Sequence, residues 1–127
     1  MSDIGKMSAV LEMIPMGKQR PRFGGRVFMS QAYLDWKNDF SRLFIGAVLS
    51  SGGNIWMIDG RFRLSLTIQT PSGKSRSDLD NIIGAVLDSL QDAVLIANDR
   101  NCVEISANLE KSGKRGVYLM SVEVESV

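Results

Sequence analysis

The segment from Arg61 to Gln69 alternates strictly between polar and apolar residues, and this pattern constrains the fold more than any other feature of the chain. Successive side chains of a strand point to opposite faces, so the pattern predicts a strand with one buried face. A loop with Pro and Gly follows, and the next segment, from about Leu79 to Gln91, repeats its apolar residues at helical spacing. The buried stripe of this expected helix consists of Ile82, Ile83, Val86, Leu87 and Leu90.

The rest of the chain divides into further short elements. Ser30 is a favourable N-cap for a helix that extends to about Ser50, and its aromatic stripe is expected in the core. Strands are expected at 8–14, 103–110 and 116–125, the last two as a closing hairpin, and another hairpin at 22–28. These elements predict an α+β fold in which residues 1–127 form a single small domain with a mixed β-sheet and two main helices.

The composition excludes several classes of chemistry. The chain contains no histidine, which rules out Ser-His and Cys-His nucleophilic pairs and the common zinc ligand sets. Cys102 is the single cysteine, so an intramolecular disulfide cannot form and a reducing compartment is favoured. The chain opens with no signal-peptide pattern and has no apolar run of about 20 residues, so we expect a cytoplasmic protein without membrane association.

Basic and acidic residues are nearly balanced in number, 15 against 14, but they are segregated along the chain. Asp78 and Asp80 open the expected second helix, and Asp99 follows in the turn beyond it. Carboxylates that converge on one pocket bind hard cations such as Mg²⁺, and neighbouring bases bind phosphate, so the pattern indicates a nuclease. The bases expected to contact phosphate are Lys18, Arg20, Arg22, Arg26, Lys74 and Arg76.

Each acid also has a purely structural interpretation. Ser77 and Asp80 have the spacing of a capping box, and acids in a first turn complement the helix dipole. Residues two apart in a helix point in nearly opposite directions, so Asp78 and Asp80 can share a metal only if Asp78 is still extended. Asp99 suits a turn, and Asp88 and Asp92 are interpreted as exposed helix-face residues or as residues behind the metal ligands.

Four elements of the sequence, in order, resemble the RusA-type endodeoxyribonucleases, the small phage and prophage Holliday-junction resolvases. They are the D-L-D-N motif of residues 78–81, the D-S-L motif of residues 88–90, Asp99 followed by Val103, and an N-terminal stretch with Arg20-Pro21-Arg22-Phe23 and Tyr33-x-x-Trp36. The resemblance covers about residues 11 to 125.

The resemblance implies a homodimer that resolves four-way junctions and related branched DNA by paired phosphodiester hydrolysis, in the cytoplasm of a bacterial or phage-infected cell. Asp78, Asp80 and Asp99 match the three essential acids of the family, which are catalytic and bind the metal. The implied cofactor is Mg²⁺, with Mn²⁺ as a substitute.

One position departs from the family pattern. Family members usually carry a catalytic lysine four residues after the second Asp of D-L-D-N, and this chain has Gly84 there. Another base, Lys18, Lys74 or Arg76, replaces that lysine, or catalysis is weakened, or the protein binds branched DNA without cutting it. Gly84 also fits a close backbone approach at a dimer interface or near DNA. A weaker interpretation is that the acids only cap helices, which predicts no effect of Mg²⁺.

Overall fold

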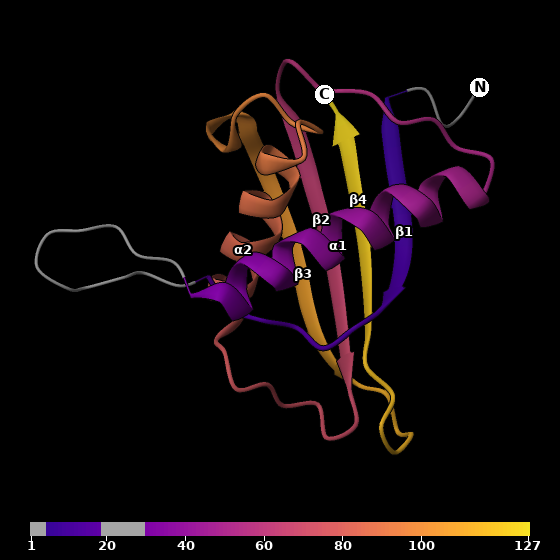
Figure 1. Cartoon of the computed structure of the whole chain (residues 1–127), viewed down its shortest axis with the longest axis vertical. Coiled ribbons are helices and arrows are strands. Elements are labelled where there is room, and N and C mark those ends of the chain that lie inside the picture. The colour runs from indigo at the N-terminus through magenta and orange to yellow at the C-terminus, as the bar shows by residue number, and fades with distance from the viewer. Residues whose placement is uncertain (1–4, 19–29) are drawn as a thin grey trace, which may run out of the picture.

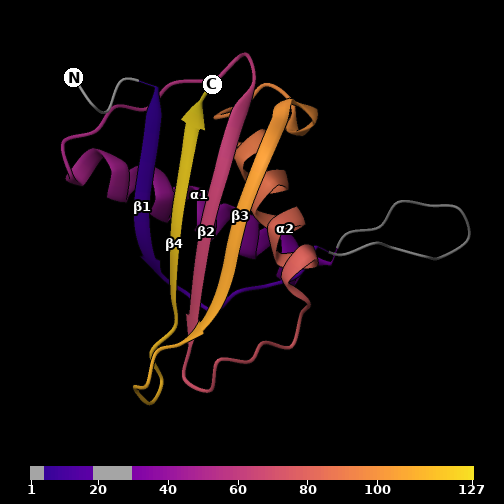
Figure 2. The same cartoon turned by 180° about the vertical axis from the view of Figure 1, so that it is seen from behind.

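A computed structural model describes residues 5–18 and 30–127 of the chain. Two helices lie on one face of a four-stranded sheet that has both parallel and antiparallel neighbours (Figure 1). The opposite face of the sheet is covered by neither helix (Figure 2). This architecture confirms the predicted α+β fold with a mixed sheet and two helices. The hairpin predicted at residues 22–28 lies outside the described residues.

The last two strands of the chain are not neighbours in the sheet, although the sequence predicts that they pair. The strands are β1 (Lys6–Glu12), β2 (Phe62–Thr70), β3 (Cys102–Lys111) and β4 (Leu119–Ser126), and their order in the sheet is β1-β4-β2-β3. β2 pairs in parallel with β3 on one side and antiparallel with β4 on the other. The predicted closing hairpin is therefore wrong, because β4 passes β2 and inserts between β2 and β1.

The side chains of β4 are more deeply buried than those of β3. Met120, Val122 and Val124 of the inner strand β4 are at most 1% exposed. Val103 and Ile105 of β3 remain 43% and 46% exposed, as the edge of the sheet permits. Period-2 alternation specifies which face a side chain occupies but not which strand lies beside it, so the sequence pattern did not distinguish the two arrangements.

Helix α1 (Gln31–Ser50) begins where the sequence predicts. The Ser30 hydroxyl accepts a hydrogen bond from the Tyr33 amide at 3.2 Å, as an N-cap does. The expected aromatic stripe is in the core, and Trp36 stacks on Phe40 with ring centroids 5.5 Å apart. The prediction that the aromatic stripe of this helix packs in the core is confirmed.

Helix α2 (Leu79–Asp92) connects β2 to the parallel strand β3 and so determines where the acidic residues lie. The chain leaves β2, enters α2, and runs back along the sheet to the short 3-10 helix η1 (Asp99–Asn101), which leads into β3. The first turn of α2 therefore lies at one end of the sheet and η1 at the other (Figures 1 and 2). The side chains of α2 that are buried against the core are Ile82, Ala85, Val86, Ser89 and Leu90.

Candidate active site at the N-terminus of helix α2

Asp78 and Asp80 lie on either side of the point where α2 begins. Asp78 occupies the N-cap position with φ −66° and ψ 151°, which is extended backbone, and Asp80 lies in the first turn of the helix. This is the conformation that two acids two residues apart need if both are to face one ion. The capping box expected from Ser77 does not form, since Asp78 is the cap residue and its side chain makes no capping hydrogen bond. Both aspartates are exposed.

The loop before Asp78 is ordered by side chains that bond to its own backbone. The Thr70 hydroxyl donates to the carbonyl oxygen of Lys74 at 2.9 Å, and the Ser75 hydroxyl accepts from the Ser77 amide at 3.3 Å. Lys74 and Arg76, on the same loop, are exposed.

Lys18 reaches the same end of α2 from the segment that follows β1. Its backbone amide donates to the carbonyl oxygen of Asn81 in the first turn of α2, at 2.9 Å. The indole Nε1 of Trp36 donates to the carbonyl oxygen of Ile14 at 2.8 Å, which fixes the start of this segment. Of the six predicted phosphate contacts, Lys18 meets the first turn of α2 through its backbone, and Lys74 and Arg76 lie on the loop that leads into α2. The other three, Arg20, Arg22 and Arg26, are outside the described residues.

Asp99 lies at the opposite end of α2. Its amide donates to Oε1 of Gln91, in the last turn of the helix, at 2.9 Å. Gln91 follows Asp80 by a helical rise of about 16 Å, at 1.5 Å per residue. The turn itself is held by Asn98, whose Oδ1 accepts from the Arg100 amide at 2.9 Å, and Asp99 is exposed. Over the described residues, no three Asp, Glu or Cys side chains gather into a group that could hold a metal ion.

The three acids are exposed and lie outside two hollows of the described surface. One hollow is lined by the end of α1, the start of β1 and Trp56, and a second by β1, β4 and the middle of β2. Neither of them includes Asp78, Asp80 or Asp99. An exposed site is accessible to a long polymer, whereas small ligands are usually held in concave pockets.

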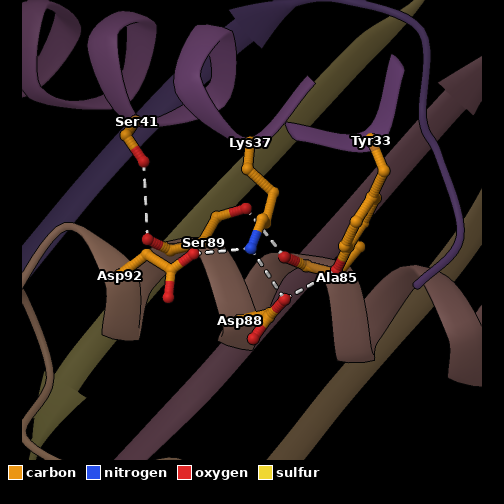
Figure 3. A network of polar contacts seen from close by, with 7 residues as sticks. All are labelled: Tyr33, Lys37, Ser41, Ala85, Asp88, Ser89 and Asp92. Carbon is orange, nitrogen blue, oxygen red and sulfur yellow. Dashed lines mark hydrogen bonds and ion pairs between the residues drawn. The ribbon is translucent and has the colours of Figure 1, made fainter. Parts of the chain in front are cut away.

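Asp88 and Asp92 both form ion pairs with Lys37; Asp92 is exposed, as the sequence predicts, but Asp88 is not, which corrects its interpretation as an exposed helix-face residue. The Lys37 ammonium on α1 lies 3.1 Å from Asp88 and 2.5 Å from Asp92, and the Tyr33 hydroxyl donates to Asp88 at 2.9 Å (Figure 3). Asp88 is half-buried, and these contacts occupy its carboxylate. The D-S-L motif therefore joins the two helices. Its Ser89 donates to the carbonyl oxygen of Ala85 at 2.8 Å.

The same contacts change the pKa values of the two α1 side chains. Burial lowers the pKa of Lys37, but hydrogen bonds to Asp92 and Asp88 outweigh it, and the net pKa is raised. Burial, and then the hydrogen bond to Asp88, raises the pKa of Tyr33 well above its ordinary value. Sequence reasoning did not identify Lys37 as a core residue. The available signal was its position inside the aromatic stripe, one turn after Tyr33 and three residues before Phe40.

Among the described residues, neither helix is both long and apolar enough to cross a membrane.

Comparisons with known proteins identify the family of this chain. No individual curated protein matches the chain. The family model described as Endodeoxyribonuclease RusA matches residues 12–121, which include both ends of α2 and all three acids. The chain therefore belongs to the RusA endodeoxyribonuclease family.

Proposed function

We propose that the protein is a Mg²⁺-dependent endonuclease that resolves Holliday junctions and related branched DNA by paired phosphodiester hydrolysis. The observation that carries the proposal is the start of α2, where Asp78 is extended immediately before Asp80 enters the helix. Two exposed carboxylates held in this way, with Lys18, Lys74 and Arg76 on segments that meet or lead into α2, combine ligands for a hard cation with ligands for phosphate.

The donor chemistry of these residues fits Mg²⁺, and Mn²⁺ as a substitute. Asp78, Asp80 and Asp99 would hold the ion, which when bound supplies positive charge to the scissile phosphate and acidifies a water molecule. Lys74 and Arg76 would bind the flanking phosphates, since their side chains are exposed on the loop that leads to Asp78. With no histidine in the chain, the carboxylates are the available side-chain proton acceptors at this site.

A site that contains all three acids needs a second copy of the chain. Within one chain, Asp99 is separated from Asp80 by nearly the length of α2. A two-fold axis perpendicular to α2 would make the partner's α2 antiparallel, and would bring the partner's Asp99 toward Asp78 and Asp80. We therefore propose a homodimer with two composite sites, one for each of the two strands that a resolvase must cut.

Exposed apolar side chains near the end of α2 provide surface for this contact. Val94, which follows α2, is 61% exposed, and Val103 and Ile105 are exposed on the edge strand β3. Val94 also has a φ of 60°, an unfavourable conformation for a β-branched residue. Burial of such residues against a second copy would remove apolar surface from water and stabilise the dimer.

The direct test is cleavage of a labelled synthetic four-way junction in Mg²⁺, beside a linear duplex of matching sequence and the Asp80→Asn variant. Paired, symmetric nicks in the junction alone, and only with the wild-type protein, are the expected result. Junction binding without cutting, in Mg²⁺ and Mn²⁺ alike, would refute the nuclease proposal. That outcome would support a protein that binds branched DNA without cutting it, in which glycine in place of lysine at position 84 accounts for the lost activity.

A further inference from the structure

Gly84, in the middle of α2, is covered by the side chain of Lys18. A Cβ atom built on Gly84 would lie 3.4 Å from both Cβ and Cδ of Lys18. Gly46, in the middle of α1, has no other atom within 4 Å of the corresponding position. The two mid-helix glycines therefore differ, since Gly46 faces open space and Gly84 is the surface over which a lysine side chain passes.

Two further contacts fix the path of Lys18. Its backbone amide is bonded to the Asn81 carbonyl oxygen, as described above. The preceding residue, Gly17, packs so closely on the α2 start that a Cβ there would lie 2.7 Å from the Ser77 hydroxyl. Only glycine permits that approach. The segment therefore contacts the start of α2 at two successive residues, Gly17 through close packing and Lys18 through its backbone hydrogen bond.

The position of Gly84 brings the Lys18 stem close to the acids. Asp80 and Gly84 are four residues apart in one helix, so they are neighbours on its surface, with Cβ positions about 5–6 Å apart. The Cβ, Cγ and Cδ atoms of Lys18 lie within 4 Å of the Gly84 Cβ position, so the Lys18 stem lies one helical turn from Asp80 on the same face of α2. Lys74 and Arg76 lie on the exposed loop before Asp78.

We propose that Lys18 is the catalytic cation of this nuclease, and that Gly84 provides the surface over which its side chain reaches the scissile phosphate. This inference rests on the proposed nuclease function. An ammonium group beside the phosphate would stabilise the negative charge that develops as the phosphodiester bond breaks. Under this proposal Lys18, and not Lys74 or Arg76, takes the catalytic role, and Lys74 and Arg76 remain phosphate contacts.

The test moves the lysine from the loop to the helix. The variants are Lys18→Ala, the double variant Lys18→Ala with Gly84→Lys, and a matched double variant, Lys18→Ala with Gly46→Lys, which returns a lysine at the open mid-helix glycine. Each is compared with wild type in single-turnover cleavage of the four-way junction in Mg²⁺. Junction affinity is measured separately in Ca²⁺, and thermal melting checks that each variant is folded.

We expect Lys18→Ala to cut about 100-fold more slowly, as when a group that stabilises the transition state is removed. Its junction Kd should change by no more than about threefold, because the loss is in the chemical step. Gly84→Lys should restore most of the rate, and Gly46→Lys should restore none.

Three results would overturn the assignment of Lys18. They are an unchanged rate in Lys18→Ala, a loss of rate fully explained by weaker junction binding, and equal rates for the two double variants. Absence of cleavage by the wild-type protein would instead count against the proposed function itself, so the two failures are distinguishable.

Discussion

The Lys37 ammonium on α1 lies 3.1 Å from the Asp88 carboxylate on α2, with only 10% of the Lys37 side chain exposed. The same ammonium lies 5.1 Å from the centre of the Tyr33 ring. This contact joins the two helices on the covered face of the sheet, and α2 carries the acids at its start. The polar network of Figure 3 therefore fixes the element on which the candidate active site is built.

Substitution of Lys37 by Met should destabilise the protein by about 2 kcal/mol, because Asp88 loses its partner while half-buried. The partial exposure of Asp92 keeps the expected loss below that of a fully buried pair. Urea unfolding measures the change in the free energy of unfolding. The matched control is Arg42→Met, which removes an ion pair to Asp39 between exposed side chains and should change stability by less than about 0.5 kcal/mol. Equal effects of the two substitutions would contradict the structural role of Lys37.

Alkaline pH should destabilise the protein through the same network. The pKa values of Lys37 and Tyr33 are both raised in the folded state, so folding holds protons that the unfolded chain releases. The stabilisation is fully present below about pH 10, where both groups are protonated in the unfolded chain, and is lost as pH rises above it. Urea unfolding at pH 8 and pH 10.5 checks this, since Tyr33→Phe should lose less stability between them than wild type. A steeper loss in Tyr33→Phe would contradict the prediction.

Lys74 and Arg76 should contribute to the salt dependence of junction binding. If each contacts one phosphate, replacing either by Ala should reduce the slope of log K against log salt concentration by about 0.9 on duplex arms. Fluorescence anisotropy with a labelled junction in Ca²⁺, over a series of salt concentrations, measures the slope. Arg42→Ala on α1 should leave it unchanged. A residue whose replacement does not alter the slope is not part of the DNA interface.

A composite site makes a prediction about mixed dimers. Asp80→Asn and Asp99→Asn homodimers should both be inactive, but a dimer of one copy of each contains one site with both substitutions and one with neither. Mixing the two inactive proteins, with subunit exchange, should therefore restore cutting of one strand per junction. Gel analysis of a junction labelled on each strand detects single nicks. If each site instead lay within one chain, the mixture would remain inactive.

The stability of the protein should change in opposite directions when Gly84 and Gly17 are each replaced by Ala. Gly84→Ala should raise stability by about 0.5–1 kcal/mol through helix propensity, since its Cβ makes only ordinary contact with Lys18. Gly46→Ala, at an open helical position, serves as its reference. Gly17→Ala should lower stability by about 1–3 kcal/mol, because its Cβ would overlap Ser77. Thermal unfolding ranks the three, and a stabilised Gly17→Ala variant would show that the segment does not need this close approach.

Much of the local structure was predictable because it depends on neighbouring residues in the chain. The alternation at β2 and the apolar stripe of α2 specify strand and helix by their periods, and Ser30 specifies where α1 begins. The sequence also predicted that Asp78 and Asp80 lie at the start of this helix, where the structure places them. Their conformation, extended at Asp78 and helical at Asp80, was identified from the sequence only as a requirement for a shared metal ion.

The tertiary structure alone decided which distant residues meet. The insertion of β4 beside β2 and the capture of Asp88 by Lys37 depend on how burial is shared across the whole sheet. The passage of Lys18 over Gly84 depends on a segment that lies far from α2 in sequence. Sequence patterns report the face and period of each element, because those follow from local backbone geometry. Contacts between elements depend on long-range packing, which no single segment of the sequence encodes.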